Sequence, residues 1–139
     1  MAGHSLRTRK NGTLELRFRF NNRTVSVYGK TQEECMNKKR LKLLDLYGSE
    51  AVSGCGKSVA ESCLCFCEKT LENGSIHEEG YKSLLRTARF IGRSRIGVIP
   101  IDELDDGMID LFKLEAAFYS EYTIKKALHM LMNIRKGNC

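Results

Sequence analysis

The chain has 139 residues, of which 42% are hydrophobic and 29% are charged, and its formal net charge is +6. This length suits one ordinary domain or two small ones, and no apolar run approaches the roughly 18 residues that cross a bilayer. The N-terminal residues MAGHSLRTRKNG lack the apolar core of a secretory signal. We therefore expect a cytoplasmic protein with no membrane partner.

The positive charge is concentrated near the N-terminus. Residues 1–47 hold 11 Lys or Arg against 4 Asp or Glu, a net of +7, whereas residues 48–139 hold 12 against 13, a net of −1. A small and strongly basic segment indicates a polyanionic partner such as nucleic acid. A basic surface that only aids solubility is the alternative.

The stretch NGTLELRFRFNNRTVSVYGKT alternates with a period of two, which predicts β-strands. Asn-Gly at 11–12 predicts a tight turn after a first strand at 6–10. A second turn at 21–23 leads to a third strand at 24–28. The apolar face of the middle strand comprises Leu14, Leu16, Phe18 and Phe20. We expect a three-stranded antiparallel sheet.

A helix should follow the sheet and cover its apolar face. The residues Thr-Gln-Glu-Glu at 31–34 form a capping box, and the helix should run to about Tyr47. Lys39 and Arg40 interrupt its apolar stripe, so either their stems extend along the core or only the second half of the helix packs.

The other face of the sheet carries four arginines against the single Glu15. A sheet or ribbon of this kind can enter the major groove of DNA, whereas an ordinary solvated face usually mixes both signs of charge. The stretch RKNGTLELRFRFNNRTVSVYGKTQEEC resembles the N-terminal arm-binding domain of tyrosine recombinases, the integrases of phages and conjugative transposons. The resemblance implies a sheet in the major groove of arm-type sites. The candidate DNA contacts here are Arg7, Arg9, Lys10, Arg17, Arg19 and Tyr28.

The Gly- and Ser-rich stretch YGSEAVSGCGKS predicts a linker at 48–57. Its end resembles a phosphate-binding loop, but that loop needs a glycine where Ala51 stands and a buried strand before it. Nucleotide binding is therefore the least favoured function. Ser58 and Glu61 instead form the capping box of the next helix, and Lys57 beside them is a candidate contact to DNA phosphate.

Four helices are expected in residues 58–139, at about 59–70, 78–91, 105–118 and 123–135. The second carries a basic stripe within an arc of ~60°, opposite its apolar stripe. The stretches SVAESCLCFCEKT, YKSLLRTARFIG, IPIDELDDGMIDLF and YTIKKALHMLMNI resemble the core-binding domain of the same recombinases. In that family a SAM-like four-helix bundle approaches the DNA groove with its second and fourth helices. The candidate contacts are Lys82, Arg86, Arg89, Arg93, Thr123, Lys125 and Lys126.

Together these patterns predict an α+β chain, with an arm-type DNA-binding domain at 1–47, a linker at 48–57 and a core-binding helical domain at 58–139. The resemblance implies sequence-specific binding of double-stranded DNA at arm-type and core-type sites, with other recombinase protomers as further partners. A free-standing DNA-binding accessory and a protein-interaction module are the alternatives.

We expect no catalysis from this chain. Tyrosine recombinases cleave with a tyrosine assisted by Arg, Lys, His-x-x-Arg and His or Trp, in a domain beyond the core-binding domain. Residues 4–7 spell His-x-x-Arg by chance, without the partner residues. We also expect no cofactor and no metal, because Cys63, Cys65 and Cys67 lack the second ligand pair of a zinc site. All six cysteines should be reduced, as is usual in the cytoplasm.

Overall fold

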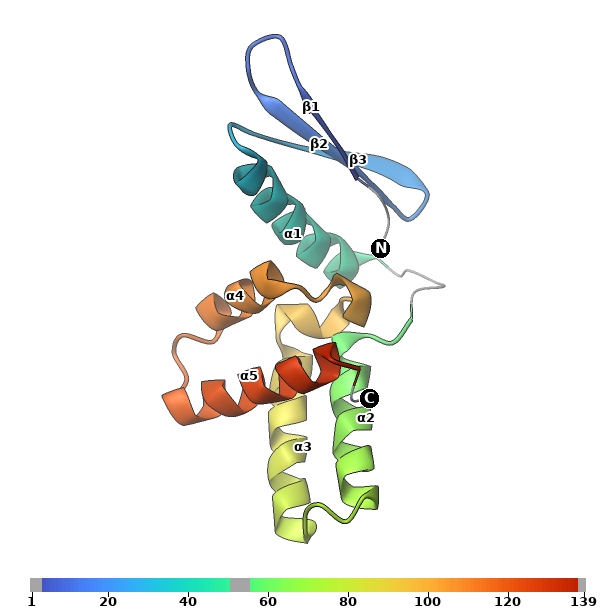
Figure 1. Ribbon diagram of the computed structural model, residues 1–139, viewed down its shortest axis with the longest axis vertical. Helices are drawn as coiled ribbons and strands as arrows, with labels where there is room; N and C mark the ends of the chain where they lie inside the picture. The colour runs from blue at the N-terminus through green and yellow to red at the C-terminus, as the bar shows by residue number, and fades with distance from the viewer. Residues whose placement is uncertain (1–3, 51–55, 138–139) are drawn as a thin grey trace. The chain divides into compact units, whose positions relative to one another are not determined.

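The computed structural model describes residues 4–50 and 56–137, and the side chain of His4 is outside that description. The chain is α+β, with a three-stranded antiparallel sheet followed by five α-helices, which confirms the predicted fold class (Figure 1). Its contacts divide it into two compact units, residues 1–53 and 54–139.

The sheet of the first unit has the strand order β1-β2-β3. Its strands are β1 (His4–Thr8), β2 (Leu14–Phe20) and β3 (Arg23–Gly29). Asn21 and Asn22 both have positive φ, as a two-residue hairpin turn requires. β1 ends two residues earlier than predicted, because the backbone from Arg9 to Thr13 closes the first turn with its own hydrogen bonds.

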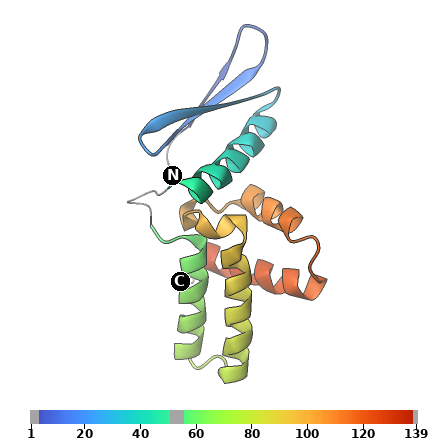
Figure 2. The same ribbon diagram turned by 180° about the vertical axis from the view of Figure 1, so that it is seen from behind.

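The core of the first unit lies between the sheet and α1 (Gln32–Ser49), which covers one sheet face (Figure 2). Leu16 and Phe18 are buried from the sheet, and Cys35 is fully buried from the first turn of α1. The Lys39 ammonium lies 5.4 Å from the centroid of the Phe18 ring, and the residue is only 5% exposed. The first of the two alternatives therefore holds for Lys39, and α1 does not pack with its second half alone, because its buried residues run from Cys35 to Leu46.

The ends of α1 are fixed by side chains. Thr31 Oγ1 accepts the Glu34 N–H at 3.1 Å as predicted, but the Glu34 carboxylate accepts the backbone N–H of Lys30 rather than that of Thr31. The helix continues two residues beyond the expected end. There Glu50 accepts a hydrogen bond of 2.7 Å from Arg23 Nη1, which ties the start of β3 to the end of the helix.

The second unit contains four α-helices with two short 3₁₀ turns between the second and third. Its elements are α2 (Val59–Glu72), α3 (Glu78–Arg93), η1 (Arg95–Val98), η2 (Ile101–Glu103), α4 (Asp106–Glu115) and α5 (Glu121–Arg135). Helices α2 and α3 pack side by side and α5 packs on both, as Figures 1 and 2 show. Ser58 caps α2 as predicted. The third predicted helix ends at Glu115, earlier than 118, and the last begins at Glu121 because Ser120 caps it.

The cysteines of α2 do not share one environment. Cys63 and Cys67, four residues apart, are buried free thiols, and burial raises their pKa values to about 12 and about 11. Cys65 points to the other side of the helix and is disulfide-bonded, so the expectation that all six cysteines are reduced is wrong at this position. Within residues 4–50 and 56–137, no group of His, Cys, Asp or Glu is arranged to hold a metal ion.

No helix in the described part of the chain has the length and apolar character to cross a membrane.

Candidate nucleic-acid interface

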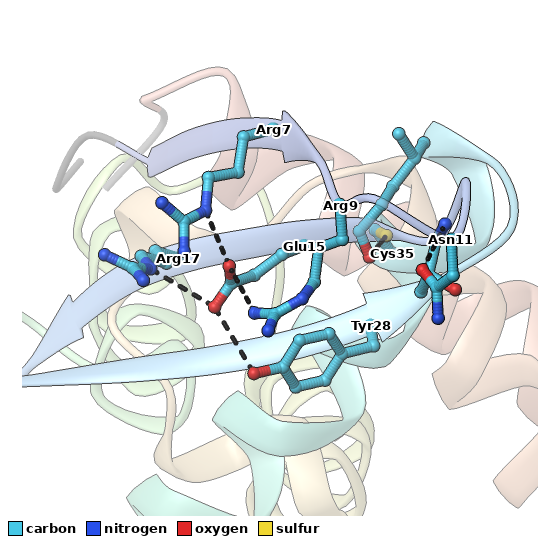
Figure 3. Close-up of polar contacts among 9 residues, drawn as sticks. Arg7, Arg9, Asn11, Glu15, Arg17, Tyr28 and Cys35 are labelled. Carbon is cyan, nitrogen blue, oxygen red and sulfur yellow. Dashed lines mark hydrogen bonds and ion pairs between the residues drawn. The ribbon is translucent and has the colours of Figure 1, made fainter.

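The open face of the sheet carries a cluster of arginines around one carboxylate. Arg7 Nε lies 2.8 Å from Glu15 Oε1, and Arg9 Nη1 lies 3.2 Å from the same oxygen. Arg17 Nε lies 3.2 Å from Glu15 Oε2. We call Glu15 and these three arginines the arginine cluster. Figure 3 shows the three guanidinium groups converging on the carboxylate.

Backbone register explains this convergence. Arg7 on β1 and Tyr28 on β3 are the direct cross-strand partners of Glu15 on β2. Directly opposite side chains on one face lie close enough to interact. Arg17 follows Glu15 by two residues and so shares its face, while Arg9 reaches in from the turn after β1.

The carboxylate of the cluster is buried, whereas its arginine partners are largely exposed. Glu15 is 2% exposed, whereas the side chains of Arg7, Arg9 and Arg17 are 57%, 47% and 44% exposed. The hydrogen bond from Arg7, aided by those from Arg17 and Ser26, lowers the pKa of the Glu15 carboxyl to about 2 although burial opposes this. Glu15 is therefore ionised at neutral pH, and the exposed guanidinium groups present the cluster's net positive charge to solvent.

Tyr28 completes the cluster on the β3 side. Its hydroxyl donates to Glu15 Oε2 at 3.3 Å, and the Arg9 guanidinium lies 5.7 Å from the centroid of its ring. The residue is 44% exposed, so part of Tyr28 is accessible to solvent. Among the described residues, the remaining candidates Lys10 and Arg19 are exposed and show no bond to Glu15. Lys10 lines an open hollow with Arg7 and Arg9.

The second candidate surface is the basic stripe of α3, defined by Lys82, Arg86, Arg89 and Arg93. All four side chains are exposed, while Thr87 and Ala88 on the opposite face are buried. Within the described part of the chain, the ion pair found on the stripe is a long one, with a Glu78 oxygen 3.9 Å from Lys82 Nζ. These basic side chains are therefore solvated and are not held around a buried group.

The candidate DNA-contacting residues of α5 differ in exposure and in their partners within the protein. Lys125 is exposed, but Lys126 is half-buried, donates to Ser83 Oγ of α3 and lies 5.3 Å from the ring centroid of Tyr122. Thr123 takes part in the N-terminal cap with Ser120. Lys126 and Thr123 thus have structural partners within the second unit. Lys57, before α2, is exposed with its Nζ 3.4 Å from Cys65 Sγ.

Two features of these surfaces were not anticipated from the sequence. In the sequence pattern Glu15 is only an acid opposing the arginines, whereas its register opposite Arg7 and Tyr28 gives it a central position. The other is a set of exposed apolar residues before, within and after the α4–α5 connection: Leu114, Phe118 and Tyr122, which are 73%, 98% and 72% exposed. The feature of the sequence that could have indicated these residues is the apolar run that follows the acidic residues at the start of α4.

Comparisons of this chain with protein-family models, with curated proteins and with solved structures found no match.

Proposed function

We propose that the chain binds double-stranded DNA sequence-specifically through the arginine cluster, and that the basic stripe of α3 with Lys125 holds a second stretch of DNA. The observation that carries this proposal is the open sheet face on which three exposed arginines are ordered around one buried carboxylate. The major groove admits a β-ribbon, and arginine is the side chain that most often reads guanine there. Phosphate contacts from other basic residues would fix the register on the duplex.

We further propose that the chain acts as the N-terminal DNA-binding part of a tyrosine recombinase and does not itself cleave DNA. Support comes from the resemblance of both segments to that family, in the family's own order. The test is a suicide substrate that traps a covalent protein–DNA adduct. No adduct is expected, and an adduct through any tyrosine would overturn this part of the proposal.

The experiment for DNA binding is a selection of duplexes from a random-sequence library, followed by titrations at several salt concentrations. We expect one enriched sequence family and an affinity that falls steeply with salt, because basic residues release counterions from phosphates. Equal binding to enriched and scrambled duplexes would contradict sequence specificity. Absence of binding even at low salt would remove the proposed function altogether.

A protein-interaction module is the second candidate, and the exposed apolar residues around the α4–α5 connection favour it. Phe118 is 98% exposed, and Leu114 and Tyr122 are 73% and 72% exposed, so these large apolar side chains are available to a partner. If these residues bind protein in place of DNA, Phe118→Ser should abolish that association while duplex affinity is absent in both forms. Light scattering over a concentration series checks self-association.

A further inference from the structure

Glu15 is an unexpected residue at the centre of a surface proposed to bind DNA. A carboxylate repels phosphate, and on electrostatic grounds alone its presence there lowers affinity for any duplex. Yet Glu15 accepts hydrogen bonds from Arg7, Arg9, Arg17 and Tyr28, and it is almost completely buried beneath them. The Glu15 carboxylate therefore holds the guanidinium groups through hydrogen bonds, in addition to its effect as a negative charge.

We propose that Glu15 is a positioning residue, which holds Arg7, Arg9 and Arg17 in one arrangement and thereby sets the DNA sequence that the sheet face prefers. This inference rests on the proposed DNA binding. It assigns the specificity of the face to a residue that touches no DNA itself.

The hydrogen-bond pattern supports this role. Each of the three arginines uses a single nitrogen toward Glu15, and an arginine carries five N–H donors. Most donors of each guanidinium are left for base edges and phosphates. An arginine with several free rotamers loses that freedom on binding, whereas one already held in place loses less and favours the sequence that fits its geometry.

Arg19 on the same sheet provides a comparison for the arginines that contact Glu15. Arg19 lies on the same face as Arg17, two residues along β2, and it is exposed with no bond to Glu15 in the described part of the chain. A change at Glu15 should therefore alter the side-chain order of Arg7 and Arg17 but leave that of Arg19 unchanged. Glu33, an exposed carboxylate in the first turn of α1, offers a matched control for the loss of one negative charge.

The experiment compares the full chain with its Glu15→Gln, Glu15→Asp and Glu33→Gln variants. NMR relaxation of the arginine Nε–H groups, without DNA, measures side-chain order. Titrations with an enriched and a scrambled duplex from the random-sequence selection then give the ratio of the two affinities. Glu15→Asp keeps the net charge and shortens the reach by one methylene, so it remains informative if Glu15→Gln does not fold.

We expect Glu15→Gln to release the Nε–H groups of Arg7 and Arg17 and to lower the affinity ratio about tenfold, the scale of one arginine–guanine contact. Its affinity for the scrambled duplex should stay equal or rise, because a negative charge is gone. Glu15→Asp should lower the ratio without that rise. Glu33→Gln should leave both the order and the ratio unchanged.

Two results would overturn the inference while DNA binding stands. One is that Arg7 and Arg17 are as ordered in Glu15→Gln and Glu15→Asp as in the original chain. The other is that their order is lost but the affinity ratio is kept. If the original chain has no affinity for any duplex, the proposed function fails and the specificity role fails with it.

Discussion

The two candidate DNA-binding surfaces carry similar numbers of basic side chains but are built in different ways. On the sheet, Arg7, Arg9 and Arg17 are gathered around a buried carboxylate by backbone register. On α3, the ion pair found among the described residues is the long one of 3.9 Å between Glu78 and Lys82, and the arginines of the stripe are exposed. The two surfaces therefore carry similar charge in different arrangements.

This difference indicates different tasks under the proposed function. Reading a base edge needs a guanidinium in a defined place and orientation, because discrimination depends on paired hydrogen bonds. Holding a phosphate needs only positive charge within reach, since such contacts carry no sequence information directly. We therefore expect the sheet to contribute sequence preference and α3 to contribute mainly affinity that depends on salt.

The contrast between the sheet surface and the α3 stripe is clearest if the two units unfold independently. Substitutions in the core of each unit test this. Ile91→Ala in the second unit removes a fully buried side chain and should destabilise that unit by about 2–5 kcal/mol. Leu16→Ala is the matched change in the first unit. Amide hydrogen exchange in each variant should report opening of the altered unit alone. Equal loss of protection in both units would mean that they unfold together.

A smaller effect is expected from removing one arginine of the sheet. Arg17→Ala should cost ~1–3 kcal/mol of discrimination between the enriched and scrambled duplexes, because a held guanidinium is lost. Arg19→Ala is its control, since Arg19 shares the face without contacting Glu15. Circular dichroism checks that both variants fold. A larger loss of discrimination in Arg19→Ala would reverse the assigned roles.

The matching change on α3 should act in another way. Arg86→Ala combined with Arg89→Ala should weaken binding to all duplexes severalfold and flatten the dependence of log affinity on log salt by about one unit per lost phosphate contact. The affinity ratio between duplexes should not change. A selective loss for one sequence would show that this stripe reads bases as well, and the contrast between the surfaces would disappear.

Local patterns in the sequence predicted much of the fold. Alternation along β2 and the Asn-rich turn predicted the sheet, and the Ser58 and Thr31 caps predicted two helix starts, because these signals act between residues close in the chain. The faces of Arg7, Arg17 and Arg19 were also predicted correctly. DNA binding by these residues remains a prediction.

The errors concern features that depend on packing in three dimensions. β1 was placed two residues late, because strand ends depend on how the turn closes its hydrogen bonds. The cysteines of α2 were treated as one group, although spacing of two residues puts Cys65 on the side away from Cys63. The central position of Glu15 is not predicted by the sequence pattern, because alternation gives only the face and cross-strand register decides which charges meet.

The smallest expected effect concerns the pH dependence of the first unit. The folded-state pKa of Glu15 is about 2, below its ordinary value of 4.5, chiefly because of the hydrogen bond from Arg7. A carboxyl whose pKa is lowered by folding stabilises the folded state fully above its unfolded pKa, and this contribution is lost as pH falls through the folded value. Glu15 should therefore stabilise the unit above about pH 4.5 and lose that effect progressively toward pH 2.

Thermal unfolding of the full chain and of Glu15→Gln between pH 2 and pH 7 checks this expectation. The difference between the two melting temperatures should be largest above about pH 4.5 and should shrink steadily below it. Glu34 and Glu50 also have lowered pKa values, through the Lys30 backbone N–H and the Arg23 side chain respectively, so both proteins should lose some stability in acid. Only the difference between the two melting temperatures is attributable to Glu15. A difference that is constant over the whole range would mean that the carboxylate is not held by the arginines, and the contrast between an ordered sheet surface and a solvated helix stripe would lose its basis.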